Sequence, residues 1–276
     1  MFSVVIPAYN CENTIVATID SVLRQTRIDL IEEIIVVNDG SEDQTEKIVN
    51  DYMLGCERKY QYINFVLISH PNKGVSYTRN RGILISKAEW IALLDSDDIW
   101  VENKLERQFY FIEKIKGICF LGATFPLCIL GKSKDGLYKL NARELCYRNM
   151  PQTSSVLFKR EVGIELGLFN ERMRYGEDIN FFQNFLLKDR CYILAESVIT
   201  KLGVGKIFYG ESGLSSNFIL MHKGRNENVR DLQKLGLIGK PFMYCMLVMN
   251  EIKLIRRIIM RLISRAVNSL KKTSKY

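Results

Sequence analysis

The 276-residue sequence lacks the features that define several structural classes. Its seven cysteines form no Cys-x-x-Cys pair, which argues against a zinc ribbon or a redox motif. Their odd number and scattered positions are typical of a reduced, intracellular protein. No internal repeat or low-complexity segment is present, and the composition excludes collagen and coiled-coil folds. The chain is 47% hydrophobic and 25% charged, so it can bury a sizeable core and is not disordered.

Long apolar runs are also absent. The first residues do not combine a basic segment with an apolar stretch, so we expect no signal peptide. The longest apolar run, residues 242–249, is far shorter than the ~20 residues of a membrane-spanning helix. These observations predict a cytoplasmic location.

Basic charge is scarce in most of the chain and concentrated at its end. The net charge is +8, and residues 251–276 carry +7 of it, from eight Lys or Arg and one Glu. A nucleic-acid-binding protein would be expected to spread basic charge over its folded surface. We therefore expect no nucleic-acid partner, and a nearly neutral body followed by a basic tail.

The first hundred residues alternate β-branched runs with stretches of helical spacing. Strands that are apolar on both faces and separated by helices indicate an α/β protein with a mostly parallel sheet covered on both sides. No linker divides the second half from this pattern, so we expect it to extend the same sheet and form the other wall of a cleft. The expected strands are 3–6, 33–38, 63–69, 90–95, 118–125 and 154–159, and the expected helices are 12–25, 42–53, 76–86, 101–116 and 177–187, with a turn at 131–136.

In such sheets, ligands bind beyond the carboxyl ends of the strands. Four loops there hold most of the polar residues: 7–10, 38–41, 69–74 and 95–98. On an extended chain, Asp95 and Asp97 would point to the same side and could bind one cation. Carboxylate oxygens suit Mg²⁺ or Mn²⁺ shared with substrate phosphates. The alternative is that Asp97 or Asp98 caps the next helix, and we expect Asp98 to do so.

Glycine-rich phosphate-binding loops are missing. Residues 7–10 stand where the fingerprint GxGxxG would follow the first strand. The segment 203–206 has neither the third glycine of that fingerprint nor the remaining residues of a GxxxxGK[ST] loop. A metal ion would therefore have to neutralise any bound diphosphate.

Five blocks of the sequence resemble, in order and spacing, the motifs of glycosyltransferase family 2. The resemblance covers residues 1–215 and implies a GT-A fold, with a nucleotide-binding half at about 1–98 and an acceptor half at about 99–215. Residues 216–276 would form a separate helical extension. The blocks are 3–10, 37–41, 72–74 with 78–82, 94–98, and 167–171 with 176–178.

The resemblance implies an inverting transfer of a sugar from a nucleotide-sugar, usually a UDP-sugar, to an acceptor hydroxyl. It also suggests a role in bacterial cell-surface polysaccharide or lipid-linked oligosaccharide synthesis, with a glycan or lipid-linked glycan as acceptor. By the same resemblance, Asp97 would bind Mn²⁺ or Mg²⁺, with Asp95 as a second contact, and Asp178 would be the general base. The nucleotide-sugar would contact Pro7, Ala8, Tyr9, Glu12, Asp39, Lys73, Gly74, Arg79, Asp95 and Ser96.

Simpler interpretations exist for single residues. Glu177 and Asp178 could satisfy amides at a helix N-terminus, Asp39 could only form a turn, and Tyr9 could be a core aromatic. In the ordered set of motifs, we favour functional roles for Asp39, Asp97 and Asp178. Cys11 we interpret as a small buried hydrophobe.

The sequence departs from the family in one segment. Many members carry a Tyr-Arg-x-His-like segment before a serine pair, whereas residues 208–216 contain neither Arg nor His. A third metal ligand is therefore open, with Glu211 or His222 as candidates, although a solvated side chain is the simpler interpretation of His222. We interpret His70 as structural.

Two other functions remain as alternatives. One is a non-catalytic member that binds a nucleotide-sugar or acts as a scaffold, against which the intact Asp97 and Asp178 argue. The other is a sugar nucleotidyltransferase, which would need a glycine- and arginine-rich loop after the first strand.

The tail has the pattern of a basic amphipathic helix. Such a helix can lie in an anionic membrane interface, which predicts a peripheral protein on the inner face of the cell membrane. The apolar segment 241–250 ahead of it is consistent with shallow insertion. The alternative is a helix packed on the catalytic domain with its basic face in water. One face carries Ile252, Ile255, Ile259, Leu262, Ile263, Ala266 and Leu270, and the other carries Lys253, Arg257, Arg261 and Arg265, with Arg256 at the boundary.

Overall fold

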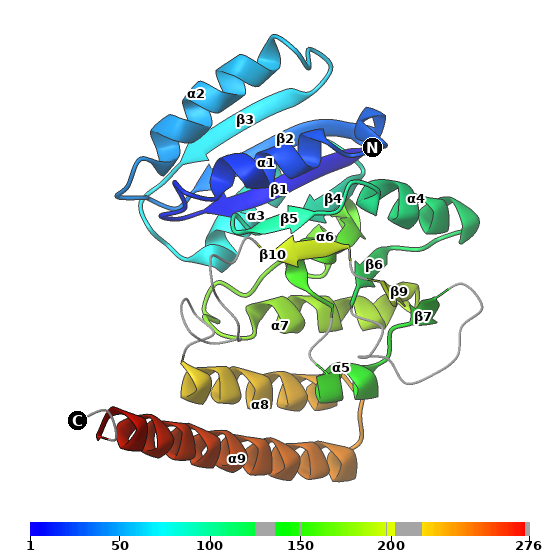
Figure 1. Ribbon diagram of the computed structural model, residues 1–276. Coiled ribbons are helices and arrows are strands. Elements are labelled where there is room, and N and C mark those ends of the chain that lie inside the picture. The colour runs from blue at the N-terminus through cyan, green and yellow to red at the C-terminus, as the bar shows by residue number, and fades with distance from the viewer. Residues whose placement is uncertain (125–135, 149–150, 197, 202–216, 274–276) are drawn as a thin grey trace. The chain divides into compact units, whose positions relative to one another are not determined.

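The computed structural model describes residues 1–124, 136–148, 151–196, 198–201 and 217–273 (Figure 1). The chain divides into two compact units, Met1–Ile207 and Phe208–Tyr276. The predicted turn at 131–136 lies almost entirely outside the described residues, as do segments 203–206 and 208–216 with Glu211.

The first unit is built on an eight-stranded sheet of order β3-β2-β1-β4-β8-β6-β9-β7. Strands β1 to β4 are parallel neighbours, β8 runs antiparallel to β4 and β6, β6 is parallel to β9, and β7 is antiparallel to β9. A second, two-stranded sheet pairs β5 with β10. The strands are β1 (Phe2–Ala8), β2 (Ile31–Asn38), β3 (Asn64–Ser69), β4 (Trp90–Leu93), β5 (Asp98–Trp100), β6 (Phe120–Ala123), β7 (Leu137–Lys139), β8 (Leu157–Lys159), β9 (Cys191–Leu194) and β10 (Ile199–Lys201).

Helices cover both faces of this sheet, as the sequence predicts (Figure 1). Successive residues of β1 enter different cores, because side chains alternate across a strand. Val4 and Ile6 belong to one apolar cluster and Val5 to another, rich in phenylalanine. The helices are α1 (Ile15–Leu23), α2 (Thr45–Glu57), α3 (Val75–Ile85), α4 (Lys104–Lys114), α5 (Ala142–Arg148), α6 (Arg160–Glu165) and α7 (Glu177–Asn184), with 3₁₀ turns at Ile28–Leu30, Thr153–Ser155 and Phe185–Lys188.

Helix α3 lies very close to the sheet at Gly82. A Cβ atom at this position would be 2.5 Å from the Cγ1 of Val5. No other residue fits between helix and strand without moving one of them. This close approach fixes the position of α3, which carries Arg79 and Asn80.

The predicted elements of the first unit are confirmed, with ends displaced by a few residues. The second half does extend the same sheet through β6 to β9. Two local predictions are wrong. Asp98 begins β5 and does not cap α4, whose N-cap position is Asn103. Residues 95–98 form a turn rather than an extended segment, because the amide of Asp98 donates to the carbonyl of Asp95 at 3.1 Å.

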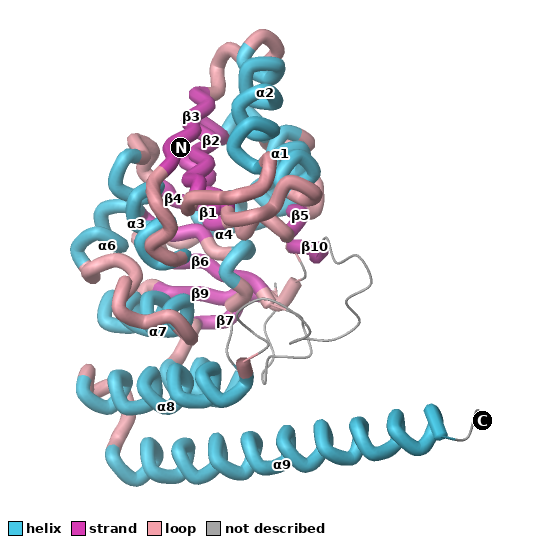
Figure 2. The backbone as a smooth tube through the Cα atoms, turned by 90° about the vertical axis from the view of Figure 1, so that its left-hand side faces the viewer, coloured by secondary structure: helices cyan, strands magenta, loops and turns pink. Residues whose placement is uncertain are grey.

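The second unit contains α8 (Phe218–Lys234) and α9 (Lys240–Thr273), which lie side by side (Figure 2). The helix predicted for the tail begins earlier than expected, at Lys240, so residues 241–250 are its first turns rather than a separate segment. His222 contacts Glu251 at 2.9 Å and Asn226 at 3.0 Å, so the interpretation of His222 as simply solvated is wrong. Among the described residues, no helix combines the length and the apolarity that crossing a membrane would require.

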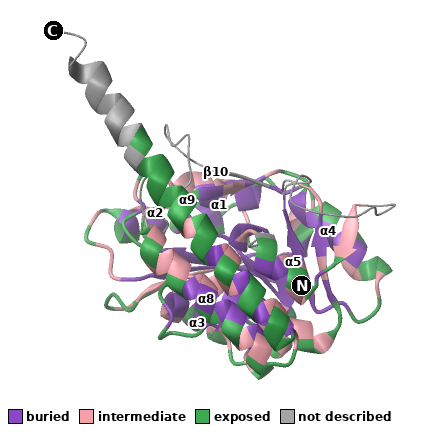
Figure 3. Ribbon diagram, turned by 90° about the horizontal axis from the view of Figure 1, so that it is seen from below, coloured by how far each residue is buried: buried purple, intermediate pink, exposed green. Residues whose placement is uncertain are grey.

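Helix α9 has buried and exposed residues (Figure 3), and many of the exposed ones are apolar. Met243, Met246 and Asn250 are buried, and the amide of Asn250 donates to the side chain of Asn226 on α8 at 2.9 Å. The exposed apolar face, as we call it below, consists of side chains that are each at least 50% exposed. It comprises Tyr244, Val248, Ile252, Ile255, Ile259 and Ile263.

Candidate active site

The carboxyl ends of β1, β2 and β3 are joined around Asp39. Its backbone amide donates to the carbonyl of Ala8 at 2.8 Å. Its carboxylate accepts from the backbone amides of Lys73 at 2.7 Å and Gly74 at 3.0 Å. Gly74 has a φ of +90°, a conformation that glycine adopts readily and other residues rarely do. Asp39 is therefore more than a turn former: it holds the loop before α3 against the end of β2.

His70 belongs to the surroundings of Asp39. Its Nδ1 lies 3.5 Å from the Oδ1 of Asp39, and its ring packs edge-on against Tyr77 at 4.8 Å. Sequence reasoning assigned His70 a structural role only. His70 lies beside Asp39 because β2 pairs with β3. The sequence near His70 does not predict this neighbour.

The loop after β1 lies next to the start of α2. Pro7 and Ala8 are buried, whereas Tyr9 is 47% exposed, which excludes the interpretation of Tyr9 as a core aromatic. The carboxylate of Glu12 accepts from the amide of Gln44 at 2.9 Å. Cys11 is buried, and burial raises the pKa of its thiol, so it has the surroundings expected of a buried hydrophobe and not of a reactive thiolate.

The acidic loop after β4 is held by Ser154. The amide of Asp95 donates to the Ser154 hydroxyl at 3.0 Å, and this hydroxyl donates to Oδ2 of Asp98 at 2.6 Å. Asp98 is buried by this contact, while Asp97 is exposed at the tip of the turn. The carbonyl of Ser96 accepts from the Thr18 hydroxyl at 3.0 Å.

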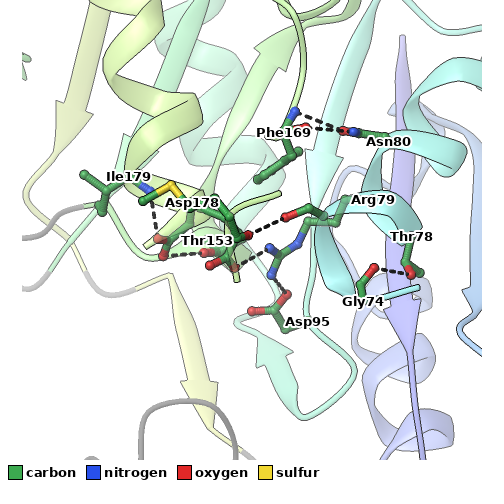
Figure 4. Close-up of polar contacts among 12 residues, drawn as sticks. Gly74, Thr78, Arg79, Asn80, Asp95, Thr153, Phe169, Asp178 and Ile179 are labelled. Atoms are coloured by element: carbon green, nitrogen blue, oxygen red, sulfur yellow. Dashed lines mark hydrogen bonds and ion pairs between the residues drawn. The ribbon is translucent and has the colours of Figure 1, made fainter. Parts of the chain in front are cut away.

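Arg79 lies between the acidic loop and α7 (Figure 4). Its Nη2 is 2.7 Å from Oδ1 of Asp95, and its Nη1 is 3.1 Å from Oε1 of Glu177. Its guanidinium also lies 5.2 Å from the ring of Phe169. Besides a backbone hydrogen bond at the start of α7, the carboxylate of Glu177 therefore has Arg79 as a second partner.

Asp178, the second residue of α7, is half-buried among polar groups. Its Oδ1 accepts from the amide of Ile179 at 2.7 Å, and its Oδ2 accepts from the Thr153 hydroxyl at 3.4 Å (Figure 4). The first contact means that Asp178 does satisfy an amide at the helix N-terminus. Burial raises the pKa of Asp178, although these hydrogen bonds and the charge of Arg79 oppose the rise. Burial and the neighbouring Asp178 raise the pKa of Glu177 to about 7.

The carboxylates of this loop fit a metal ion that is shared with a substrate. The described residues contain no group of three or more His, Cys, Asp or Glu side chains that could hold an ion alone. Mg²⁺ is commonly bound by one or two carboxylates together with substrate phosphates. Exposed Asp97, with the carboxylate oxygen of Asp95 that Arg79 leaves unbound, provides that smaller set of hard oxygen donors.

The predicted site residues thus fall into two groups. One group surrounds Asp39 and includes the loops that carry Tyr9, Glu12 and Lys73. The backbone amide of Lys73 donates to the carboxylate of Asp39. The other surrounds Arg79 and joins the acidic loop to α7. Sequence reasoning missed the contacts of Thr153, Ser154 and Glu177 in the second group, because each partner lies at least 25 residues away in the chain.

Comparisons with known proteins agree with this architecture. The family model for "Glycosyl transferase family 2" matches residues 3–139. The chain is 38% identical over 117 residues to the Escherichia coli UDP-Glc:alpha-D-GlcNAc-diphosphoundecaprenol beta-1,3-glucosyltransferase WfaP, covering 42% of this chain and 43% of that protein. It is 31% identical over 229 residues to the Bacillus subtilis minor teichoic acid biosynthesis protein GgaA, covering 76% of this chain and 47% of that protein. The chain therefore spans less than half the length of these two relatives.

Solved structures share the fold. S. aureus TarS 1–349 in complex with UDP superposes with a TM-score of 0.60 at 18% identity, covering 89% of this chain and 69% of that chain. The mannosyltransferase PcManGT from Pyrobaculum calidifontis, in complex with GDP-Man and Mn²⁺, superposes with a TM-score of 0.60 at 15% identity. This match covers 91% of this chain and 86% of that chain. The expected GT-A fold is confirmed. With the ordered motifs, the sheet and the matching family model together, the chain belongs to glycosyl transferase family 2.

Proposed function

We propose that this protein is an inverting glycosyltransferase that moves a sugar from a UDP-sugar to an acceptor hydroxyl. One observation carries the proposal: Arg79 joins the acidic loop after β4 to the helix start that bears the half-buried carboxylate Asp178. Two carboxylates therefore belong to one connected site. Asp97, through a metal ion, could assist a leaving diphosphate, and Asp178 could accept a proton. The glucosyltransferase WfaP, whose name specifies UDP-Glc, is a relative.

The donor's nucleoside would lie at the ends of β1 and β2. Exposed Tyr9 offers an aromatic face to a base, and the buried Pro7 and Ala8 precede it at the end of β1. An ionised carboxylate has about four lone-pair sites. The amides of Lys73 and Gly74 use two sites of Asp39, so it can also accept the uracil imide proton. The remaining donor contacts we propose are Glu12, Lys73, Gly74, Asp95 and Ser96.

Asp97 would hold Mn²⁺ or Mg²⁺, with Asp95 as a second contact. When bound, such an ion stabilises the negative charge that develops on a leaving nucleoside diphosphate. The protein's own contribution is the turn at residues 95–98, which keeps Asp97 exposed while Ser154 holds its neighbours.

Asp178 would accept the proton of the acceptor hydroxyl. A general base is most effective when its pKa approaches the working pH, and burial moves the pKa of Asp178 in that direction. Attack by the deprotonating hydroxyl on the anomeric carbon, from the side opposite the leaving diphosphate, inverts that centre. The names of WfaP and GgaA support a lipid-linked or cell-surface glycan as acceptor.

The exposed apolar face of α9 is proposed to dock on an anionic membrane surface, at the inner face of the cell membrane. Apolar side chains can enter the interface, and each nearby Lys or Arg adds about 1 kcal/mol of attraction to anionic lipid. Charge favours this partner over a second copy of the chain, since two tails that each carry +7 repel one another.

Release of UDP from a panel of UDP-sugars tests the enzymatic proposal. We expect release with one donor in Mn²⁺ or Mg²⁺, enhanced by a lipid-linked glycan acceptor and abolished by EDTA. Tight UDP binding without turnover of any donor would instead support the non-catalytic alternative. Release that is unaffected by EDTA would refute the role of the metal.

A further inference from the structure

Both terminal nitrogens of Arg79 are paired with carboxylates of the protein. The side chain is 5% exposed, and its two terminal nitrogens face Asp95 at 2.7 Å and Glu177 at 3.1 Å. Its Nε is buried and has no hydrogen-bond partner in the part of the chain that the structure describes. Phe169 lies against the guanidinium at 5.2 Å. This arrangement differs from that of an arginine that reaches into a pocket to bind a nucleotide.

The two carboxylates come from distant segments. Asp95 is 16 residues from Arg79 in the chain, and Glu177 is 98 residues away. A planar guanidinium can bind two carboxylates in a fixed geometry, which the single ammonium group of lysine cannot reproduce. Arg79 therefore sets the separation between the acidic loop and the start of α7.

The neighbouring residue on α3 strengthens this connection. Asn80 donates to the carbonyl of Phe169 at 2.9 Å and to Glu171 at 2.9 Å, and accepts from the amide of Phe169 at 2.9 Å. The segment that leads to α7 is thus fixed to α3, which Gly82 in turn fixes to β1. The rotation of α7 that would carry Asp178 away from the acidic loop is opposed at two adjacent positions.

We propose that Arg79 is a positioning residue that holds the metal-side loop and the base-bearing helix at their working separation, and that it does not bind the diphosphate. The proposal rests on the proposed function, because it assigns Asp97 to the metal and Asp178 to the proton. It also gives Asp95 two roles: its Oδ1 pairs with Arg79, and its other carboxylate oxygen can contact the metal.

Three variants test the proposal: Arg79→Lys, Glu177→Gln and, as a matched control, Arg81→Lys. Arg81 is exposed two residues further along α3. In Arg79→Lys we expect kcat to fall about 10²-fold, since a displacement of ~1 Å between reacting groups can cost that much. We expect the Kd of UDP in Mn²⁺ to stay unchanged, because Arg79 does not touch the nucleotide. Glu177→Gln should also lower kcat, to a smaller extent, and Arg81→Lys should behave as wild type.

Amide hydrogen exchange provides a readout that is independent of turnover. The first turn of α7 should exchange faster in Arg79→Lys than in wild type, with no change in Arg81→Lys. If Arg79→Lys fails to fold by circular dichroism, Glu177→Gln carries the test, because it leaves the pair with Asp95 intact.

Two results would overturn the proposal. Weaker UDP binding with an unchanged kcat in Arg79→Lys would show that Arg79 contacts the donor. Wild-type kcat and wild-type exchange in both Arg79→Lys and Glu177→Gln would show that it positions nothing. Inactivity of the wild type with every donor would refute the proposed function instead, and the exchange measurement would still decide the role of Arg79.

Discussion

The hydroxyl of Ser154 donates to the carboxylate of Asp98 at 2.6 Å while it accepts the amide of Asp95 at 3.0 Å. One side chain thereby fixes both ends of the acidic turn. Asp98 is turned into the protein, and Asp97 is left at the exposed tip. Of the acidic residues in the turn, Asp97 is therefore the one whose removal should affect a bound ion most and the fold least.

Replacement of Asp97 by alanine should abolish sugar transfer and weaken UDP binding in Mn²⁺. The fold should survive, because an exposed carboxylate contributes little to the core. Calorimetric titration of UDP with and without Mn²⁺ checks the binding, and Glu102→Ala is the control, since Glu102 is an exposed carboxylate shortly after the same turn. Near-normal turnover of Asp97→Ala in the presence of metal would refute the assignment.

Replacement of Asp178 by asparagine should preserve donor binding and reduce kcat by ~10²–10⁴-fold, the usual contribution of a general base. Asparagine keeps the shape of the side chain but cannot accept the proton. Time courses of UDP release give kcat, and a parallel measurement of the Kd of UDP gives the donor affinity. A lost donor affinity with an unchanged kcat would instead assign Asp178 to the nucleotide pocket.

The pH dependence of kcat/KM should report the base. Because burial raises the pKa of Asp178, and the base works deprotonated, activity should fall with decreasing pH at a higher pH than for an ordinary aspartate. Thr153→Val removes a hydrogen bond that lowers this pKa, so the acid limb should move to still higher pH. An acid limb that moves to lower pH in Thr153→Val would contradict the assignment.

Lys104 should destabilise the protein at neutral pH. Its side chain is completely buried at the first position of α4, and burial lowers its pKa well below the usual value. Among the described residues, its Nζ has no hydrogen-bond partner and lies 4.0 Å from the ring centre of Trp100. The lowered pKa means that burial outweighs the attraction of the ring for the cation.

Lys104→Met should therefore raise the free energy of unfolding at pH 7, because methionine brings no charge that burial must strip of water. The unfolded chain binds the extra proton, so wild-type stability rises with pH from the folded pKa up to the unfolded value near 10.5. The advantage of the variant should shrink over that range. Urea unfolding at pH 7 and pH 9.5 checks both signs, and an advantage that grows with pH would contradict the explanation.

Loss of apolar side chains on α9 should abolish membrane binding. Because α9 also packs on α8, we prefer the triple change Ile252→Glu, Ile255→Glu and Ile259→Glu on the exposed apolar face to removal of the helix. Cosedimentation with vesicles containing phosphatidylglycerol should decrease strongly, while UDP-sugar hydrolysis remains.

Leu54→Glu, at an exposed leucine on α2, is the control for the added charge. Equal vesicle binding by the wild type and the triple variant in low salt would refute docking. A wild-type oligomer that dissociates in the triple variant, seen by light scattering, would instead assign the face to a second copy of the chain.

The sequence by itself determined the alternation of strands and helices in the first hundred residues and the loops in which the polar residues gather. It did not predict β5, β7, β9, β10, α5 or α6. Both depend on local properties: apolar runs such as residues 33–38 form strands whichever partner they meet, and the carboxyl ends of parallel strands necessarily share one edge. The motif blocks added the family and its expected roles.

Only the tertiary structure decided how those residues are connected. Arg79, which was expected near the nucleotide, pairs with Asp95 and Glu177. Asp98 was expected to cap a helix and instead accepts from Ser154. These partners are 16 to 98 residues apart in the chain. Periodicity and local propensity contain no information about such contacts, because a hydrogen bond between distant segments depends on how the whole sheet brings their loops together.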